Sequence, residues 1–565
     1  MKIITLHCDY IKFKPLKKAL KSVEEVPSKE EEVKEPLVVL TAIESQDTKK
    51  EIFQLVESVK KTAKEVKAEN VVLYPYAHLS HDLANPDKAQ DFLKKAESEL
   101  KKSLKVIKAP FGYYKSFELK CKGHPLSELS KHFGEIVSVP QKKSEGTSDP
   151  SRLLKEISRS RLDTSKLKEN DHRILGQKLD LFSFSEAAPG SVFWHNNGLI
   201  IYNELLKFVR DMNFRAGYKE ISTPQILDSR LWKISGHWDK YKDNIFLTEY
   251  EGRKFAAKPM NCPGGMLVFK AKTKSYKDLP LRVAEMGTVH RQELSGVLAG
   301  LFRLIKFTQD DAHIFCTEQQ LESEIIKTID LIEIYFKTFG LPYKVELSTR
   351  PEKRIGSDKI WSKSEKILED ALRKKKMKYK LNKGEGAFYG PKIDFHVWDS
   401  LKRNWQLSTI QLDFSMPERF ELEYIGKDNK RHTPIMLHRA ILGSLERFIG
   451  ILLEEKNGVL PLWLSPIQVR VINFTDRNNK TVKKLVEDLR KEIQSLRVDY
   501  DLENTTLGDK IRNAELLKIP YIVVIGDKEE KGKTLAVRSR GEKPKFGVKL
   551  SAFAKELKEK IEKRL

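Results

Sequence analysis

Polar side chains that can do chemistry recur at alternate positions of the segment 303–313. Arg303, Gln309, Asp311 and His313 share one parity. Because successive side chains of a strand point to opposite faces, a strand here presents a guanidinium, an amide, a carboxylate and an imidazole together. The opposite face holds apolar side chains that can pack on a core: Phe302, Leu304 and Ile314. We therefore predict that this segment lines a polar cleft. An exposed sheet face with scattered charges is the alternative.

Two further segments gather polar or small residues on one face. A strand predicted over 404–414 places Thr409, Gln411 and Asp413 on the same side. We also expect a helix over 438–455, with an apolar stripe and a second face of small residues and one arginine: Ala440, Gly443, Ser444, Arg447 and Gly450. A flat group can lie against such a face beneath the guanidinium. Packing against another helix would also use small residues but would not favour the arginine.

One thiol and two imidazoles from distant parts of the chain are of the types that bind Zn²⁺. Cys262 lies in KPMNCPGG, His313 lies near the end of the polar strand, and His438 begins the predicted helix. Three protein ligands leave a fourth position open, as in catalytic zinc sites. On these residues alone the more ordinary interpretation is a buried cysteine acting as a small apolar residue, beside two histidines that bind no metal.

A second pair of polar residues precedes the strand. Arg291 and Glu293 have the parity of Arg303 and are followed by the glycine-containing loop 295–300. Two arginines that face one cleft suit a triphosphate, because the planar guanidinium matches phosphate oxygens in pairs. Glu293 can hold an amine or a metal. An Arg–Glu ion pair is the alternative, and at a surface it would contribute little to stability.

Composition restricts the class of protein. Lys and Arg outnumber Asp and Glu 104 to 80, a net charge of +24, which suits a polyanionic partner such as RNA or DNA. Four cysteines in 565 residues provide no disulfide framework and indicate a reducing compartment. There is no long apolar run and no signal-peptide pattern at the start. We expect a cytoplasmic protein that does not enter a membrane.

The order of helix and strand patterns indicates a multidomain protein of mixed α/β and α+β class. Residues 1–140 predict a compact α/β domain in which the charged stretch 22–36 is a solvated loop. Residues 141–171 are polar and basic and predict a linker with a helical middle. The block 172–464 mixes helices with many strands, and 465–565 follows a βαβ pattern typical of a small, mainly parallel sheet.

Several stretches of the central block carry a specific resemblance. They read GHWDKYKDNIF, KPMNCPGG, HRQE, FTQDDAHIFC, FYGPKIDF, WQLSTIQLDFS and HRAILGSLERFIG. They resemble the threonyl-tRNA synthetase family of class II aminoacyl-tRNA synthetases. The resemblance implies a catalytic domain built on an antiparallel sheet flanked by helices. It also implies a homodimer, because the helix near 194–214 and the strand containing Pro224 resemble the dimer-forming motif 1.

The resemblance assigns roles to individual residues. ATP binding, with Mg²⁺, is implied for Arg291, Glu293, Arg303, Gln406, Thr409, Ser444 and Arg447. Threonine binding is implied for Gln309, Asp311, Tyr389 and Gln411, and one Zn²⁺ per subunit is implied on Cys262, His313 and His438. Arg291, Arg447, Lys392 and His237 match residues of the catalytic steps, of which His237 is implicated in transfer to tRNA. Gly265 and Gln292 depart from the family, which usually has histidine and asparagine there; Gly265 removes any transfer role of that histidine.

An editing function follows from the chemistry of threonine selection. Valine lacks the hydroxyl that a metal would bind, whereas serine lacks only a methyl group, worth about 10–200-fold in discrimination. Serine therefore has to be removed after activation. VVLYPYAHLS and KAPFGYYKSFELKCKGHPLSELS resemble the archaeal editing domain of this family, which is similar to D-aminoacyl-tRNA deacylases. The resemblance implies editing roles for His78, Tyr114, Lys115 and Glu128.

The C-terminal block resembles the anticodon-binding domain of related synthetases, which implies that Asn504, Glu529 and Arg538 read anticodon bases. The whole resemblance implies a threonine–tRNA ligase that charges tRNA(Thr) using ATP and threonine and hydrolyses mischarged seryl-tRNA(Thr). A class II relative for another amino acid and a non-catalytic RNA-binding relative are the alternatives. The first would lack the zinc ligands, and the second would have lost a ligand or an arginine.

Overall fold

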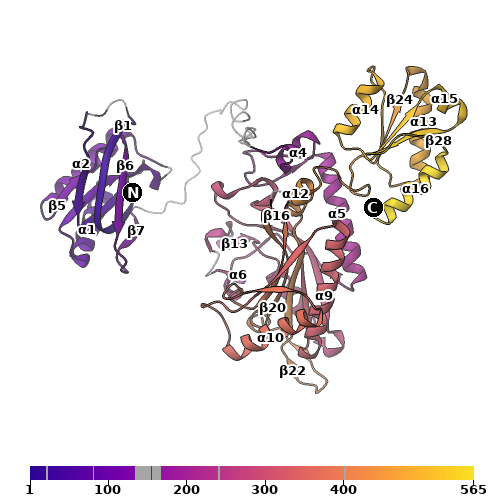
Figure 1. The fold of residues 1–565 in the computed structure, drawn as a ribbon. Coiled ribbons are helices and arrows are strands. Elements are labelled where there is room, and N and C mark those ends of the chain that lie inside the picture. The colour runs from indigo at the N-terminus through magenta and orange to yellow at the C-terminus, as the bar shows by residue number, and fades with distance from the viewer. Residues whose placement is uncertain are drawn as a thin grey trace. The chain divides into compact units, whose positions relative to one another are not determined.

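The computed structural model divides the chain into two compact units, Met1–Thr147 and Ser148–Leu565 (Figure 1). The structure describes residues 1–20, 23, 25–80, 82–133, 154, 167–238, 242–399 and 402–564. Most of the predicted linker 141–171, including its helical middle, lies outside these residues. Among the described helices, none combines the length and apolar character that crossing a membrane requires.

The first unit is a seven-stranded sheet covered by two helices. The long strand β1 (Lys2–Lys18) pairs with β3 and β7 over its first half and with β2 and β6 over its second half. The apolar stripes of α1 (Lys49–Val66) and α2 (Pro86–Lys101) pack on the sheet. The other elements are β2 (Glu31–Lys34), β3 (Pro36–Ala42), β4 (Asn70–Pro75), the short helix η1 (Ala77–Leu79), β5 (Lys105–Lys108), β6 (Tyr113–Cys121) and β7 (Glu128–His132).

The loop predicted for 22–36 is wrong over part of its length. Strand β2 lies within it and pairs Val33 with Ile11 of β1. Val33 is the single apolar residue of EEVK and is buried, whereas its charged neighbours are exposed. One apolar side chain among charges is sufficient for an edge strand, because only one face of this strand has to pack.

The second unit contains an eight-stranded sheet in the order β10-β15-β16-β23-β20-β19-β17-β18. Pairing is antiparallel except between the two strands at either edge. The strands are β10 (Lys219–Glu220), β15 (Leu281–His290), β16 (Lys306–Cys316), β17 (Tyr343–Ser348), β18 (Tyr379–Asn382), β19 (Lys392–Trp398), β20 (Asn404–Asp413) and β23 (Ile435–Ser444). Helices α5 (Asn196–Arg215), α9 (Glu318–Phe339), α10 (Asp358–Lys374) and α12 (Leu445–Glu455) contribute to the core beside it. The predicted mixed class, with sheets flanked by helices, is confirmed.

Short elements surround this sheet and carry several of the polar side chains. Those before β16 are α4 (His172–Lys178), β8 (Phe182–Ser183), β9 (Phe193–Trp194), β11 (Ile226–Asp228), α6 (Arg230–Ile234), η2 (Lys242–Asn244), β12 (Leu247–Tyr250), β13 (Arg253–Ala257), α8 (Cys262–Lys270), β14 (Lys274–Ser275), η3 (Tyr276–Asp278), η4 (Ser295–Val297) and η5 (Gly300–Phe302). Those after it are α11 (Ser415–Arg419), β21 (Tyr424–Ile425) and β22 (Arg431–His432).

The helix predicted for 438–455 is wrong over its first seven positions. These residues belong to β23, and α12 begins only at Leu445. Gly443 has φ +69°, a conformation in which side chains are strained, so the chain turns there from strand to helix. Ser444 then caps the helix by accepting the backbone N–H of Arg447 at 3.2 Å. The apolar spacing that suggested one helix therefore spans a strand-to-helix junction.

The C-terminal region of this unit is a five-stranded sheet in the order β25-β24-β26-β27-β28. The predicted parallel pairing is confirmed for β25, β24 and β26 and is wrong for the rest of the sheet, because β26, β27 and β28 pair antiparallel. The elements are β24 (Val469–Asn473), η6 (Asp476–Asn478), α13 (Asn479–Glu492), β25 (Val498–Asp501), α14 (Leu507–Leu516), β26 (Tyr521–Ile525), α15 (Asp527–Gly532), β27 (Leu535–Ser539), β28 (Lys545–Val548) and α16 (Leu550–Glu562).

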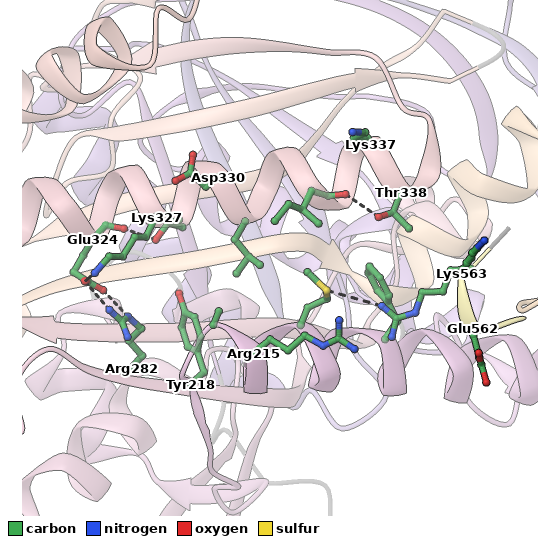
Figure 2. Close-up of a pocket in the computed structure, with 17 residues that line it drawn as sticks. Arg215, Tyr218, Arg282, Glu324, Lys327, Asp330, Lys337, Thr338, Glu562 and Lys563 are labelled. Carbon is green, nitrogen blue, oxygen red and sulfur yellow. Dashed lines mark hydrogen bonds and ion pairs between the residues drawn. The ribbon is translucent and has the colours of Figure 1, made fainter. Parts of the chain in front are cut away.

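A cavity of about 920 Å³ lies between α5, α9 and the end of α16 (Figure 2). Much of its charge is already paired. Arg282 binds Glu324 through two hydrogen bonds of 2.5 and 2.7 Å, and Lys327 reaches the same carboxylate at 3.1 Å. Arg564 binds Asp211 at 2.6 Å. The cavity contains none of the residues to which the sequence assigned chemistry, although it is larger than the cleft described below.

We predict that Asp310→Ala destabilises the second unit by about 3–5 kcal/mol. The Asp310 carboxylate is fully buried and accepts the backbone N–H groups of Ile441, Leu442 and Gly443 at 2.9–3.1 Å, with Arg439 3.7 Å away. Its removal leaves these donors without an acceptor and the guanidinium without its neighbouring carboxylate. Urea unfolding measures the loss. Asp330→Ala is the control, because that half-exposed carboxylate only pairs with Lys375 at the surface. Equal effects of the two substitutions would contradict the prediction.

Candidate active site

A cleft of about 570 Å³ lies on one face of β16, β20 and β23. In β16, Phe307, Gln309 and Asp311 are partly exposed to the cleft, whereas the intervening side chains are buried on the other face. The strand begins at Lys306, so Arg303 reaches the cleft from the segment just after η5 instead of from the strand itself. The cleft gathers most of the residues named from the sequence: Cys262, Arg291, Glu293, Arg303, Gln309, Asp311, Tyr389, Lys392, Gln406, Thr409, Gln411, His438, Ser444 and Arg447.

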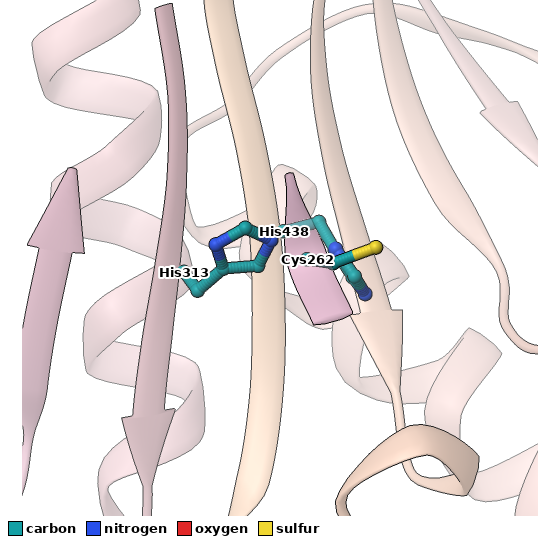
Figure 3. A group of neighbouring side chains, drawn as sticks. All are labelled: Cys262, His313 and His438. Atoms are coloured by element: carbon teal, nitrogen blue, oxygen red, sulfur yellow. The ribbon is translucent and has the colours of Figure 1, made fainter. Parts of the chain in front are cut away.

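The candidate metal ligands meet at this cleft. Cys262 begins α8, and His313 and His438 are directly paired residues of β16 and β23. One ligand atom from each lies within 4.8 Å of the other two (Figure 3). The Nε2 atom of His313 is buried and has no hydrogen-bond partner among the described residues. An unsatisfied buried nitrogen is costly for a protein, and a bound cation would satisfy it.

The electrostatics of the three side chains also fit a metal. Burial raises the pKa of the Cys262 thiol well above its ordinary value and lowers the pKa of His313 to about 4. Burial alone thus favours a neutral thiol and a neutral imidazole. A divalent cation would favour the thiolate and use the imidazole lone pair, so the donor set fits Zn²⁺.

Two neighbours support the histidines. Asp413 binds His438 Nε2 at 2.9 Å, which leaves Nδ1 of that ring as the atom available for a metal. A Cβ atom at Gly265 would lie 3.5 Å from His313 Nδ1. Gly265, which departs from the family pattern, therefore lies directly beside the candidate ligand His313. The sequence showed Asp413 on a polar face but did not identify this contact.

Three guanidinium groups also converge in this cleft. Burial lowers the pKa of Arg447, and Arg291 and Arg303 lower it further by repulsion. Arg303 binds Glu293 at 2.8 Å, and Arg447 donates to the carbonyl of Phe302 at 2.9 Å. Like charges held together in a partly buried site favour a polyanionic ligand.

Hydrogen bonds fix further polar side chains of the cleft. Asn261 donates to Asp311 at 3.2 Å, and the Tyr389 hydroxyl donates to Gln411 at 3.1 Å. Asp394 organises the remaining groups: it pairs with Lys392 at 2.7 Å and accepts from Gln406 and Thr409 at 2.6 and 2.8 Å. Asn261 and Asp394 were not identified from the sequence.

His237 lies behind the cleft and does not line it. Its imidazole is fully buried, its Nδ1 is 2.8 Å from Ser235 Oγ, and its ring is 6.2 Å from that of Tyr389. Burial lowers the pKa of His237 to about 4. The side chain is therefore a neutral neighbour of a cleft residue in this structure.

The first unit has a cavity of about 540 Å³ lined by His78, Tyr114 and Lys115 among other residues. Lys115 donates to the carbonyl of Pro110 at 2.9 Å, and burial lowers its pKa to about 8. Glu128 is not among the described residues that line this cavity. It is exposed on β7, where it pairs with Leu6 of β1. The structure thus brings together three of the four residues that the resemblance implied for editing.

The three residues implied in anticodon reading lie on different elements. Asn504 is exposed after β25, Glu529 lies in α15, and Arg538 lies in β27. Glu529 accepts the Gly526 N–H at 3.1 Å, and Arg538 is 3.4 Å from Glu515.

Three family models match the chain. They are the archaea-specific editing domain of threonyl-tRNA synthetase over 1–133, the class II tRNA synthetase core domain (G, H, P, S and T) over 246–456, and the anticodon binding domain over 468–560. Threonine–tRNA ligase of Desulforamulus reducens is 50% identical over 419 residues, 74% of this chain and 65% of that protein. That of Acetivibrio thermocellus is 51% identical over 397 residues, 70% of this chain and 62% of that protein. The chain thus spans slightly less than two thirds of these curated relatives.

Solved structures agree with the sequence matches. The RNA-binding domain of threonyl-tRNA synthetase from Cryptosporidium parvum superposes with a TM-score of 0.67 at 40% identity, over 69% of this chain and 98% of that one. A protein described as a threonyl-tRNA synthetase from Aeropyrum pernix gives 0.62 at 30% identity, over 70% of this chain and 97% of that one. On these matches over nearly the whole of two relatives, together with the three family models, the chain belongs to the threonyl-tRNA synthetase family.

Proposed function

We propose that the chain is a threonine–tRNA ligase that activates threonine with ATP, charges tRNA(Thr), and hydrolyses mischarged seryl-tRNA(Thr) through its first unit. The observation that carries this proposal is the presence of two kinds of binding group in one cleft. They are a thiol and two imidazoles suited to Zn²⁺, and three arginines suited to a triphosphate. A non-catalytic RNA-binding relative would have no need of either.

Cys262, His313 and His438 would hold one Zn²⁺ per subunit. When bound, Zn²⁺ supplies a Lewis-acidic position to which an amino group and a hydroxyl can both coordinate. Asp311 would hold the amino group by charge, and Tyr389 and Gln411, linked by their 3.1 Å hydrogen bond, would bound the side chain. Valine would leave polar groups of the site unpaired, which is a strong basis for rejection.

The arginines would orient ATP for attack by the threonine carboxylate. An oxygen of the carboxylate attacks the α-phosphorus, and pyrophosphate leaves. Arg291 and Arg303 would hold phosphate oxygens through their planar forks, while Arg447 would cover the adenine. Mg²⁺, when bound with ATP, supplies further positive charge for the leaving pyrophosphate. A terminal ribose hydroxyl of tRNA then attacks the carbonyl carbon, and AMP leaves.

The remaining proposals rest on the family. The net charge of +24 and the matched anticodon-binding region support tRNA(Thr) as the polyanionic partner, with Asn504, Glu529 and Arg538 as readers of its anticodon. A homodimer is proposed from the likeness of α5 and the segment containing Pro224 to motif 1; the strand predicted there is wrong at Pro224 itself, which lies between β10 and β11. The exposed Phe214 and Ile226, 81% and 57% accessible, support an interface there.

We predict zinc-dependent ATP–pyrophosphate exchange with threonine, weaker exchange with serine, and none with valine. Serine should be weaker by about 10–200-fold, because it lacks only a methyl group, and valine by about 10⁴-fold or more, because it leaves a polar site unpaired. Cys262→Ser should lose both zinc and exchange. Cys121→Ser is the matched control, because that thiol lies in the first unit. Folded, metal-loaded protein that exchanges with none of the three amino acids would refute the ligase assignment.

We predict that Lys115→Met lowers hydrolysis of seryl-tRNA(Thr) by about 100-fold at pH 7, through loss of a cation that stabilises developing negative charge. With a pKa of about 8, Lys115 loses its proton above that pH, so wild-type hydrolysis above the uncatalysed rate should fall by pH 9, whereas Lys115→Arg should retain it. Lys120→Met is the control on the same strand, because Lys120 is an exposed partner of Asp9.

The lowered pKa of Lys115 also predicts that Lys115→Met, which lowers hydrolysis, raises the stability of the first unit at pH 7. The folded pKa of Lys115 lies below its unfolded value of 10.5, so protonation disfavours the folded first unit below about pH 8. Lys115→Met should therefore melt at a higher temperature than wild type at pH 7, and this difference should vanish as the pH approaches 10.5. A substitution that lowers both hydrolysis and melting temperature at pH 7 would contradict this account.

A further inference from the structure

His172 joins the start of the described second unit to the helix that carries Arg447. The residue begins α4 and is 1% exposed. Its Nδ1 atom lies 2.7 Å from Glu454 Oε1, and its backbone N–H donates to the same oxygen at 3.2 Å. Glu454 is near the end of α12, and its other oxygen binds Arg403, whose guanidinium lies 4.9 Å from the centre of the Phe302 ring.

The second nitrogen of the ring holds the segment beside the cleft. His172 Nε2 accepts the backbone N–H of Leu301, in η5, at 3.0 Å. A backbone N–H only donates, so Nε2 carries the lone pair and Nδ1 carries the proton given to Glu454. Asp171, His172 and Glu454 lie close enough together to suggest a second metal site. With both ring nitrogens engaged, His172 has no lone pair left for a metal, and its role is to bridge two elements.

The segment held in this way contributes directly to the cleft. Leu301, Phe302 and Arg303 are all among its lining residues. The Phe302 ring lies 4.3 Å from that of His172 and 4.5 Å from that of Trp405, and the Phe302 carbonyl accepts from Arg447 at 2.9 Å. A shift of this segment would therefore move two of the three converging guanidinium groups.

Gly300 shows how closely the histidine approaches. It has φ +55°, and a Cβ atom there would lie only 2.3 Å from His172 Nε2. Glycine is thus needed both for the turn and for the hydrogen bond at Leu301. His172 also lies outside the stretch 246–456 matched by the synthetase core model, and no sequence motif singled it out.

We propose that His172 is a positioning residue for the nucleotide: its bond to Leu301 N–H sets Phe302 and Arg303 in the orientation that binds ATP. This inference rests on the proposed function, because it takes the arginine cluster of the cleft to be an ATP site. His172 acts on the nucleotide through η5 and touches no reacting atom. The threonine-binding part of the cleft, formed by β16, β20 and β23, does not depend on it.

Two substitutions separate the two hydrogen bonds of the ring. His172→Gln keeps an acceptor near the position of Nε2 but loses the donor to Glu454. His172→Asn keeps a donor near Nδ1 but loses the acceptor for Leu301. We expect His172→Asn to raise KM for ATP about tenfold in pyrophosphate exchange, with KM for threonine and kcat nearly unchanged. His172→Gln should stay within about twofold of wild type. Equilibrium binding of ATP without threonine should follow the same order.

The controls distinguish positioning from simple loss of stability. Each variant loses one hydrogen bond, so their melting temperatures should fall together while their affinities for ATP differ. His195→Asn is the matched control, because His195 also binds a carboxylate, Asp180 at 2.6 Å, but does not line the cleft. Gly300→Ala should reproduce the rise in KM for ATP by displacing the ring, and it provides the same test if His172→Asn does not fold.

Equal KM for ATP in the Asn and Gln variants, or equal changes for ATP and threonine, would overturn the inference. Wild-type protein that binds no ATP would instead refute the proposed function, and the inference with it.

Discussion

The pairing of β16 with β15 and β23 decides where the central groups of the cleft lie. The register sets His313 directly against His438 and Asp311 against Ala440. Because side chains alternate along a strand, the same register sends Ala312 and Ile314 into the core. A slip of one residue would exchange the cleft face for the core face. Asp310 opposes such a slip, since its buried carboxylate binds three successive N–H groups of β23 at the irregularity in the pairing.

Two groups of side chains in the cleft are completed by a ligand: clustered arginines that an anion would neutralise, and neutral metal-binding side chains that a cation would join. Arg447 is partly buried beside Arg291 and Arg303, and their repulsion is relieved by an anion. Elsewhere in the cleft, a thiol and two imidazoles surround a position that a cation would satisfy. Such a site is organised before its ligands arrive, so their charge is used for binding instead of for reorganising the protein. His172 extends this organisation to the segment that positions Arg303.

Period-two alternation was sufficient to predict that Gln309 and Asp311 of β16 face the cleft, because a strand buried on one side has only one way to place its residues. The prediction is wrong before Lys306, where the segment is not a strand and Phe302 and Leu304 line the cleft together with Arg303. Apolar spacing typical of a helix gave a wrong prediction for part of 438–455. The chain changes there from strand to helix at a junction fixed by Asp310, a residue far away in the sequence. The candidate zinc ligands followed from motif resemblance and not from spacing. The position of Glu128 could not be predicted from the sequence, because the pairing of β7 with β1, which places Glu128 opposite Leu6, depends on tertiary packing. His172 gave no signal, since its contact with Leu301 exists only in the folded chain.

The most direct test of the account is to replace the metal with Co²⁺ and record the visible absorption spectrum. We predict one Co²⁺ per subunit, a charge-transfer band from the Cys262 thiolate that is absent in Cys262→Ser, and a change in the metal bands on adding threonine or serine but not valine. This result would place the amino acid on the metal and the metal on the predicted ligands. A protein that takes up no Co²⁺, or a spectrum that valine changes as threonine does, would contradict the account.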